Sequence, residues 1–201
     1  MKLGPKYKIA KRLGASVFEK TQGQKFALAL ERGAVKKRGR APSEFGKQLL
    51  EKQKMRISYG LTEKQFGNYV KKAMSARGTN PATALHESLE MRLDNLVYRL
   101  GLAKTRRFAR QMVSHGHITV NGVKTTIPSQ KIYLGDKIAI REGSKKSTMF
   151  EGFEARFRET PLASYLSWNP KEMAGEVKVL PTTESASVAG DIAMVLSFYS
   201  R

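Results

Sequence analysis

Cysteine is absent from this chain of 201 residues. The protein therefore forms no disulfide, holds no thiolate nucleophile and offers no cysteine to a metal ion. This absence fits a reducing compartment, and we expect the protein in the cytoplasm. Long apolar runs are also missing. No stretch reaches the roughly 18 apolar residues that a helix needs to cross a bilayer, and no apolar segment follows Met1-Lys2 as in a secretory signal. We expect no membrane partner.

Aspartate and histidine, from which many catalytic and metal sites are built, are scarce. The chain has only Asp94, Asp136, Asp191, His86, His115 and His117. No histidine has a partner at the spacing of metal ligands, and the phosphate-binding and nucleophile-elbow motifs are missing. An enzyme needs a convergent set of reactive groups. We therefore expect no catalytic residue, no metal and no cofactor.

Positive charge, in contrast, is in large excess. The formal net charge is +20 at pH 7 and the pI is about 10.3, which indicates a polyanionic partner: RNA, DNA or an anionic membrane surface. Residues 1–60 hold 16 Lys and Arg against 4 Asp and Glu, and residues 91–142 hold 10 against 3. Residues 143–201 are balanced, with 7 of each sign. We expect the first two segments to contact the partner and the last to be structural.

Residues 1–42 lack sustained hydrophobic periodicity, and glycine and proline interrupt them repeatedly. Small basic clusters lie between these interruptions. One interpretation is a disordered tail. The other is an extended arm that becomes ordered on RNA through phosphate contacts. The interleaved Tyr7, Phe18 and Phe26 favour the arm.

Capping signals predict three helices in the next segment. Ser43 is the N-cap of a helix over residues 44–57. The capping box Thr62-Glu63-Lys64-Gln65 begins a second helix. Asn80-Pro81, with asparagine as the cap and proline at the first helical position, begins a third. The first of these helices is basic, which leaves open a solvated helix or a phosphate-contacting face.

Residues 91–142 combine two short amphipathic helices with a small sheet. In the first helix, Arg92, Asn95 and Arg99 form a polar stripe beside an apolar face. Thr105 is the N-cap of the second helix, whose first turns carry several arginines. Cations at a helix N-terminus oppose the macrodipole. A fold tolerates that cost if the arginines serve a phosphate, which the free N–H groups of the helix end also attract.

Two hairpins are predicted after these helices. Asn121-Gly122 lies between alternating residues and is a strong signal for a tight hairpin turn. Residues 132–140 alternate around Gly135-Asp136 and predict a second hairpin, in which Asp136 is a turn residue.

The C-terminal quarter is predicted to brace the rest. Residues 147–158 can be helical, and residues 165–168 and 176–179 read as strands. Trp168 is interpreted as a packing anchor, although a base-stacking role stays open. Residues 191–199 are too uniformly apolar to be exposed, so we expect them to pack on the first helices.

Three motifs in residues 91–142 occur in a fixed order. They are RLDNLVYRLG at 92–101, TRRFARQM at 105–112 and SHGHITVNG at 114–122. Together they resemble the helix–turn–helix-plus-sheet RNA-binding domain named after small-subunit ribosomal protein four. Pseudouridine synthases, some tyrosyl-tRNA synthetases and a heat-shock protein share this domain. The resemblance thus implies RNA binding without fixing one function.

The remaining chain resembles the bacterial ribosomal protein family itself. Leu3-Gly4-Pro5-Lys6 resembles the family's start, Glu51-Lys52-Gln53-Lys54 its helical region and residues 191–201 its terminus. Many members bind zinc through cysteines in the N-terminal arm. This chain has none and resembles a zinc-free variant.

The family resemblance implies a structural protein of the small ribosomal subunit. Such a protein would be a primary binder of the 16S rRNA 5′ domain and would nucleate assembly of the subunit body. It would also contact mRNA where the messenger enters the ribosome. Its protein partners would be neighbouring small-subunit proteins, notably the fifth, and it would influence translational accuracy.

We predict the RNA contacts in three groups. The first lies on the two helices: Arg92, Asn95, Arg99, Thr105, Arg106, Arg107, Arg110, Gln111, Ser114 and His115. The second lies on the basic helix: Lys47, Lys52, Lys54 and Arg56. The third would contact mRNA or rRNA: Lys36, Lys37, Arg38 and Arg40.

The predicted fold class is α+β. A helical N-terminal domain with a basic extended arm precedes an RNA-binding domain of two short helices on a small antiparallel sheet. The expected limits are residues 1–43 for the arm, 44–90 with 181–201 for the helical domain, and 91–180 for the RNA-binding domain, whose core is 91–142.

Two other functions were weighed against this one. An RNA-modifying enzyme such as a pseudouridine synthase needs a separate catalytic domain with an active-site aspartate, and no stretch outside residues 91–142 is long enough for one. A DNA-binding or membrane-surface protein fits the charge but not the motifs.

Overall fold

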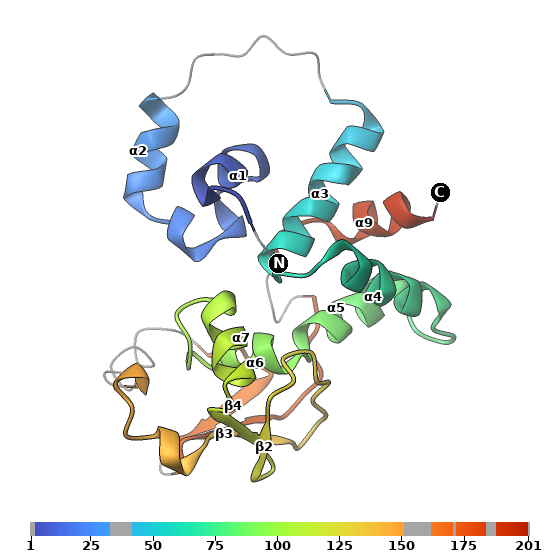
Figure 1. Ribbon diagram of the computed structural model, residues 1–201. Helices are drawn as coiled ribbons and strands as arrows, with labels where there is room; N and C mark the ends of the chain where they lie inside the picture. Colours follow the sequence, from blue (N-terminus) through green and yellow to red (C-terminus); the bar gives the residue numbers. More distant parts are fainter. Residues whose placement is uncertain (1–2, 33–41, 151–161, 171, 184–187, 201) are drawn as a thin grey trace. The chain divides into compact units, whose positions relative to one another are not determined.

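The protein is α+β, as predicted, and consists of two compact units (Figure 1). The computed structural model describes residues 3–32, 42–150, 162–170, 172–183 and 188–200. The first unit comprises residues 1–85 and 188–201, and the second comprises residues 86–187. No helix in the described part of the chain has both the length and the apolar character needed to cross a membrane.

The described residues form helices, several of which begin at a capping side chain. They are α1 (Lys6–Leu13), α2 (Gln24–Arg32), α3 (Glu44–Ser58), α4 (Glu63–Ser75), α5 (Pro81–Glu90), α6 (Leu93–Arg99), α7 (Arg106–Ser114) and α9 (Ile192–Tyr199). Side-chain oxygens of Ser43, Thr62 and Asn80 accept hydrogen bonds from N–H groups in the first turns of α3, α4 and α5. Each such cap is worth about 1 kcal/mol. All three predicted helix starts are confirmed.

The C-terminal helix α9 packs against α3 and α4 of the first unit. The Gln48 side chain donates a hydrogen bond to Ser197 Oγ at 3.1 Å. The Tyr199 hydroxyl donates to the Glu63 carboxylate at 3.0 Å. Rings of Phe66 and Tyr199 meet with centroids 6.2 Å apart. The apolar C-terminal segment therefore covers the first helices, as its sequence indicates.

The N-terminal residues are helical, so the prediction of an extended arm is wrong for residues 3–32. Helices α1 and α2 are joined by two single 3-10 turns. Together with α3 these elements enclose a small core of Ala10, Leu13, Val17, Phe18, Phe26 and Ile57. The two helices are only 8 and 9 residues long, too short for a clear periodic signal. Helices of this length depend on tertiary packing, which local sequence does not reveal.

The second unit is built on a five-stranded antiparallel sheet with strand order β2-β1-β3-β5-β4. The strands are β1 (Ile118–Val120), β2 (Val123–Thr125), β3 (Lys137–Ile140), β4 (Leu166–Asn169) and β5 (Ala174–Val177). Asn121 and Gly122 join β1 to β2 with φ of 50° and 80°, as the mirror-image type I turn requires. The first predicted hairpin is therefore confirmed.

The second predicted hairpin, over residues 132–140, is wrong. Strand β3 pairs with β1 and β5 and has no partner strand in residues 132–134. Instead Ile132 donates its N–H to Met91 O at 2.9 Å, and Lys131 forms an isolated bridge with Arg92. Alternation marked the residue facing the core correctly, since Ile132 is fully buried. It could not identify the neighbouring chain, because pairing is decided by long-range packing.

Helices α6 and α7 cover one face of the sheet (Figure 1). Their inward residues join the inward residues of the strands in one core. Its members include Leu93, Leu96, Met112, Ile118, Ile138 and Val177. Gly101 and Gly116 follow the two helices with φ of 73° and 72°, which lets the chain reverse toward the next element.

The C-terminal strands extend this sheet rather than forming a separate layer. Strand β5 pairs with both β3 and β4. Trp168 of β4 is partly buried against the core of the second unit, which agrees with a packing role. Of the helix expected over 147–158, Thr148–Phe150 forms a single 3-10 turn, and residues 151–158 lie outside the described part.

Gly175 of β5 gives a test of this packing. A Cβ at this position would overlap the side chain of Leu100, which is fully buried. We expect Gly175→Ala to lower the free energy of unfolding by about 1–3 kcal/mol, measured by urea denaturation. Gly143→Ala is the control, since only the Arg141 guanidinium approaches its Cβ, at 3.9 Å. Equal stability of the two variants would contradict the packing described.

Candidate nucleic-acid interface

An exposed polar stripe runs along α7. Arg107, Gln111 and Ser114 lie at i, i+4 and i+7 on this helix, and all three are exposed. His115, the exposed C-cap residue, extends the stripe. Thr105 Oγ1 caps the helix by accepting from Phe108 N–H at 3.1 Å. The opposite face, with Ala109, Met112 and Val113, is buried, so the stripe is held in one orientation.

Asp94 organises the first of two buried ionic clusters beneath α7. The Arg92 guanidinium donates two hydrogen bonds to its carboxylate, at 2.9 and 3.1 Å. Arg110 of α7 donates to the same carboxylate at 2.6 and 2.8 Å. The side chains of Arg92 and Asp94 are 2% and 5% exposed. One buried negative charge thus binds two arginines and ties α7 to the start of α6.

Glu90 organises the second cluster and is completely buried. Arg99 donates to both carboxylate oxygens, at 2.9 and 3.0 Å. Asn95 and Tyr165 each donate to Glu90 Oε2, at 2.9 and 2.8 Å. Burial, reinforced by the Glu90 charge, raises the pKa of Tyr165 far above its usual value. The Tyr165 hydroxyl therefore stays protonated and remains a donor.

Arg106 connects the second cluster to the surface. Its Nε donates to Asn95 Oδ1 at 2.9 Å. Its guanidinium carbon lies 4.4 Å from the centre of the Tyr98 ring, a distance at which a cation is attracted to the ring face. Arg106 is half-buried in this position, so the chain fixes its direction before any ligand arrives.

The structure corrects two of the contacts predicted on these helices. Arg92 and Asn95 are each 2% exposed and donate to buried acceptors, so they cannot reach a ligand outside the protein. They are positioning residues. Arg99, Arg106 and Arg110 are half-buried beside carboxylate or amide oxygens. Only part of each guanidinium faces outward.

The basic helix α3 is also different from the prediction. Lys52 is buried, donates to Glu63 at 2.5 Å and lies 4.5 Å from the centre of the Phe198 ring. Arg56 also pairs with Glu63, at 3.2 Å. Lys54 pairs with Glu51, and the exposed Lys47 pairs with Glu44 at 3.5 Å. Lys52 and Arg56 share one carboxylate and Lys54 has its own, so part of their charge is offset within the protein. The pair of Lys47 and Glu44 is more than half exposed. Buried Lys52 is excluded as a direct contact.

Glu63 of α4 pairs with Lys52 and Arg56 of α3, and these contacts shift its pKa. Burial alone would raise the pKa of its carboxyl group. Hydrogen bonds from Lys52 and Tyr199, together with the nearby positive charges, outweigh burial and hold the pKa below its usual value. The carboxylate therefore remains charged and keeps its cations.

Five further cations were considered as contacts or lie beside the site. Lys36, Lys37, Arg38 and Arg40 lie outside the described residues. Lys104, just before α7, is exposed and was missed by the sequence interpretation, although its place beside Thr105 could have indicated it.

Within the described ranges, no group of three His, Cys, Asp or Glu side chains could hold a metal ion.

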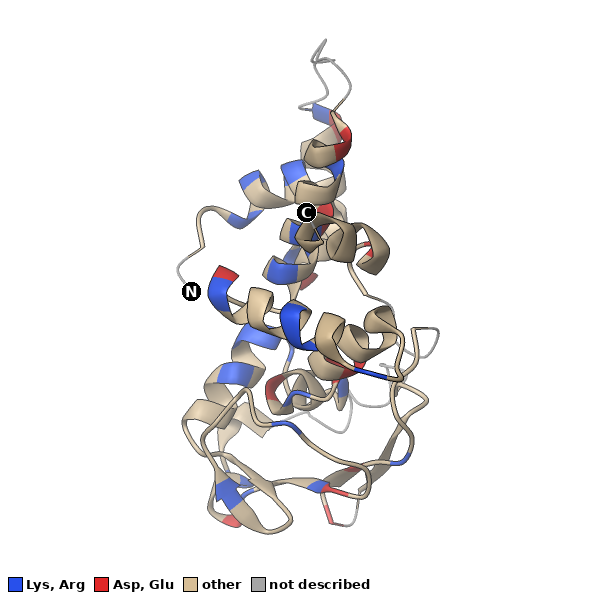
Figure 2. Ribbon diagram, turned by 90° about the vertical axis from the view of Figure 1, so that its right-hand side faces the viewer, with Lys and Arg blue, Asp and Glu red and all other residues tan. Residues whose placement is uncertain are grey.

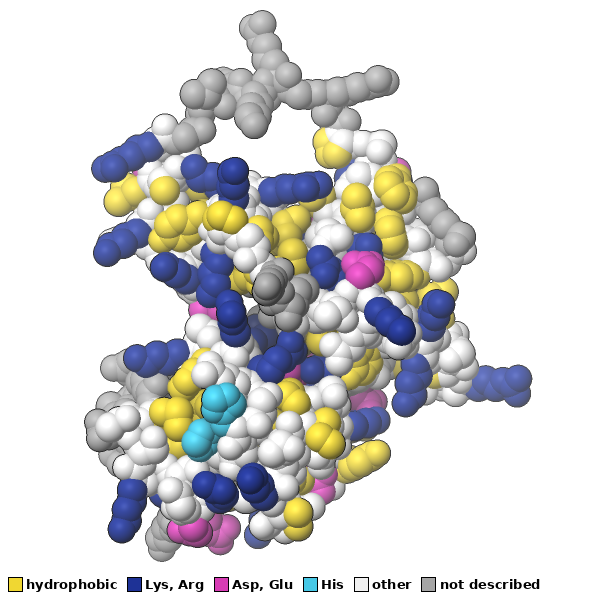
Figure 3. Space-filling model, viewed as in Figure 1, with side chains coloured by type: hydrophobic (Ala, Val, Ile, Leu, Met, Phe, Trp, Pro, Cys, Tyr) yellow, Lys and Arg dark blue, Asp and Glu magenta, His cyan; other side chains and the backbone are white. Residues whose placement is uncertain are grey.

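Positive charge predominates on the surface. Lys and Arg positions recur along the helices, and Asp and Glu positions are few (Figure 2). In the space-filling view many cationic side chains project into solvent, whereas little acidic surface is visible on this face (Figure 3). A surface of this kind attracts a polyanion.

Removing the central charge of the second cluster tests its role. We expect Glu90→Gln to lower the free energy of unfolding by about 3–5 kcal/mol, because Arg99 would lose its buried counter-charge. Urea denaturation measures this change. Glu142→Gln removes a carboxylate that is 86% exposed and pairs with Lys145, so it should have little effect. A mild effect of Glu90→Gln would show that the cluster does not hold the helices.

His117 predicts a dependence of stability on pH. Burial and the nearby positive charges of His115 and Arg141 lower its pKa from the ordinary 6.5. The unfolded chain therefore takes up a proton first, and stability falls as pH drops from about 6.5 toward the folded pKa. Unfolding in urea between about pH 5 and 8 measures this. His117→Gln should reduce this loss of stability at low pH. An unchanged pH profile would show that other groups cause the loss.

Comparison with known proteins shows which family the chain resembles. A model described as "Ribosomal protein S4/S9 N-terminal domain" matches residues 2–90, and one described as "S4 domain" matches residues 91–138. Small ribosomal subunit protein uS4B of Clostridium acetobutylicum is 41% identical over 200 residues, which cover 99% of this chain and 97% of that protein.

Further relatives agree over the same length. Small ribosomal subunit protein uS4 of Roseiflexus sp. (strain RS-1) is 43% identical over 205 residues, and that of Limosilactobacillus fermentum is 39% identical over 201 residues; each match covers 98% of both chains. The matched lengths thus span both units of the chain. The chain therefore belongs to the uS4 family of small ribosomal subunit proteins, a family of structural proteins rather than enzymes.

Proposed function

We propose that this protein is a structural component of the small ribosomal subunit and a primary binder of the 16S rRNA 5′ domain. The observation that carries the proposal is the exposed stripe of α7, which two buried ionic clusters hold in place inside the matched S4 domain. The full-length similarity to uS4 proteins supports the choice of ribosomal RNA.

The chemistry of the stripe suits a folded RNA backbone. Arg107 provides a guanidinium that can bind a phosphate through two parallel N–H···O hydrogen bonds. Gln111, Ser114 and His115 provide neutral or titratable hydrogen-bonding groups of the kind that contact 2′-hydroxyls and phosphates. Side chains cannot read the deep groove of A-form RNA, so such a surface recognises shape. Half-buried Arg106 and Arg110 would add charge from fixed positions at little further cost in side-chain entropy.

The family resemblance supports three further parts of the proposal. By binding early, the protein would nucleate assembly of the subunit body. It would lie near the place where mRNA enters, with Lys36, Lys37, Arg38 and Arg40 as contacts. It would affect translational accuracy through contact with the fifth small-subunit protein. We also propose the division into a helical domain, residues 44–90 with 181–201, and an RNA-binding domain, residues 91–180. The first 43 residues, predicted as an extended arm, instead include helices α1 and α2.

The alternatives are less well supported. An RNA-modifying enzyme would need a second domain beside the S4 domain, yet uS4 relatives match this chain along its whole length. A DNA-binding protein would share the basic charge. Competition between a 16S 5′-domain transcript and duplex DNA of equal length distinguishes these functions, and preference for the DNA would contradict the proposal.

Substitution of Arg107 tests the stripe. We expect Arg107→Gln to weaken binding to a 16S 5′-domain transcript and to reduce the slope of log K against log salt by about 0.9, the loss of one phosphate contact. Filter binding across a salt series measures both. Lys178→Gln removes the same charge from an exposed position beyond β5, and should change the slope less. If the two variants behave alike, the stripe is not the interface.

A further inference from the structure

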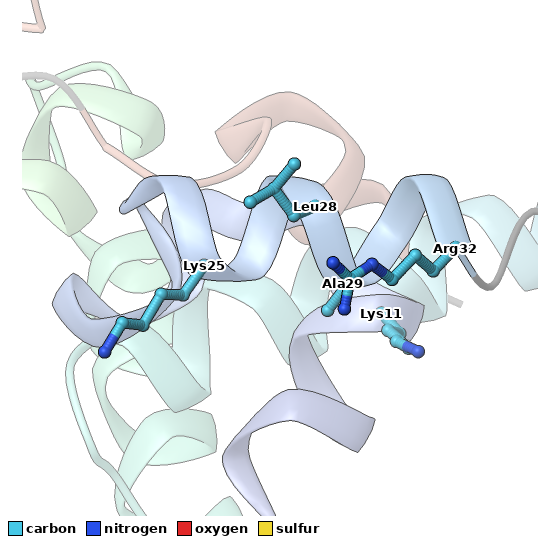
Figure 4. A pocket seen from close by; sticks show the side chains of 5 residues that line it. All are labelled: Lys11, Lys25, Leu28, Ala29 and Arg32. Carbon is cyan, nitrogen blue, oxygen red and sulfur yellow. The ribbon is translucent and has the colours of Figure 1, made fainter.

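The exposed cations of the first unit need no new role. Lys11 of α1 and Lys25 and Arg32 of α2 border a hollow of about 470 Å³ (Figure 4). These side chains belong to the basic surface that is already expected to contact RNA. The second unit contains a different kind of feature, a pair of residues that can react with each other.

Asn121-Gly122 is the only asparagine–glycine pair in the sequence. Asparagine is a chemically labile residue. It becomes aspartate or isoaspartate when the backbone nitrogen of the next residue attacks its side-chain amide carbon. Glycine in the next position makes this attack easiest, because no Cβ stands beside its nitrogen. Both residues are exposed, so water and base can reach them.

The other four asparagines are poor candidates for this reaction. Two precede proline, whose nitrogen carries no hydrogen and cannot attack. Two lie inside helices, where the following N–H group is used by the helix. In α6, for example, Leu96 N–H donates to Arg92 O at 2.9 Å. The four residues are Asn80 and Asn169 before proline, and Asn68 and Asn95 in α4 and α6.

The fold holds the Asn121 side chain by both ends. Its Oδ1 accepts from Lys137 N–H at 2.8 Å, and its Nδ2 donates to the Asp136 carboxylate at 2.8 Å. The other Asp136 oxygen accepts from Tyr133 N–H at 2.8 Å, so the carboxylate itself is held. The contacts of Asn121 with Asp136 and Lys137 are named here the Asn121 clamp. They tie the turn after β1 to residues 15 and 16 positions later in the chain.

The Asn121 clamp opposes the reaction in two ways. Attack by the Gly122 nitrogen requires the carboxamide to turn, and this breaks its bonds to Asp136 and Lys137. The intermediate also carries negative charge on the amide oxygen, which the nearby Asp136 carboxylate repels. The reactive pair is therefore protected as long as the turn and the start of β3 stay joined.

We propose that Asn121 is a modification site, whose spontaneous conversion to aspartate and isoaspartate is held back by the Asn121 clamp and proceeds when the clamp opens. The Gly122 nitrogen forms a bond to Asn121 Cγ, and its proton passes to the departing amine. The Cγ–Nδ2 bond breaks, which releases ammonia and leaves a five-membered succinimide ring. Water then adds to a ring carbonyl and opens the ring. Opening at one carbonyl gives aspartate, and opening at the other gives isoaspartate.

Neither product fits the Asn121 clamp. Deamidation replaces Nδ2, the donor to Asp136, with a carboxylate oxygen, so two negative charges meet where a hydrogen bond stood. Isoaspartate also adds a backbone carbon to the turn that pairs Val120 with Val123. Because β1 lies between β2 and β3, the modification weakens the sheet on both sides of β1.

The test removes one side of the clamp. Asp136→Ala deletes the carboxylate, and Asp136→Asn keeps its shape but loses its charge. Glu142→Ala is the control, since it removes an exposed carboxylate beyond the other end of β3. Each full-length protein is incubated at mildly alkaline pH, folded or in urea. Mass spectrometry of the peptide with residue 121 follows deamidation, and enzymatic carboxyl methylation counts isoaspartate.

In urea, all four chains should convert Asn121 at the same rate, because the clamp is absent. The folded unsubstituted protein and Glu142→Ala should convert it at least about 10-fold more slowly. Folded Asp136→Ala should lose protection by a factor on the order of 10, since a hydrogen bond to a charged group contributes enough to change the opening frequency by that factor. Asp136→Asn should fall between these rates.

Two outcomes would overturn the inference. One is an equal rate for the unsubstituted protein when folded and in urea. The other is equal protection of Asn121 in Glu142→Ala and in the Asp136 variants. Circular dichroism shows which variants are folded, and if Asp136→Ala is not, Asp136→Asn decides the comparison alone.

Discussion

The burial of Glu90 is the constraint on which the second unit depends. A carboxylate removed from water is costly unless donors surround it. Here Asn95, Arg99 and Tyr165 supply them, from α6 and from the chain just before β4. The donors are held as firmly as the acceptor, and through Asn95 the arrangement also fixes Arg106 of α7. Charge is thus used first to define the fold, and the direction of the outward cations follows from it.

In the first unit, too, some cations are paired inside the protein and others face outward. Glu63 pairs with both Lys52 and Arg56, and the Phe198 ring of α9 lies against Lys52. The surplus of cations appears elsewhere, on α1, α2 and the outer side of α7. Net charge alone did not distinguish structural cations from available ones. Burial and the location of the few carboxylates did, and this explains why an abundance of basic residues overestimates the size of an interface.

Local chemistry determined which features the sequence revealed. Caps at Ser43, Thr62 and Asn80 and the turn at Asn121-Gly122 were predictable because each depends on a few neighbouring residues. Arg107, Gln111 and Ser114 were predicted as contacts on the second helix, and the structure shows that all three are exposed. Burial of Arg92, Asn95 and Lys52 was not predictable, because their acceptors are recognised only once the chain is folded. Tyr165 reaches Glu90 across 75 positions. The short helices α1 and α2 were missed because their packing partners lie on α3.

The strand order has a consequence for the protein before it meets RNA. In the described part of the chain, β2 and β4 lie at the edges of the sheet, and an open edge can recruit a strand from another molecule and start aggregation. Strand β2 has three residues and carries the exposed Lys124, and β4 has four residues and is followed by Pro170. Short edges with a charge or a proline nearby resist such pairing. The sheet therefore offers little open edge to a strand of another molecule, which disfavours aggregation through strand pairing.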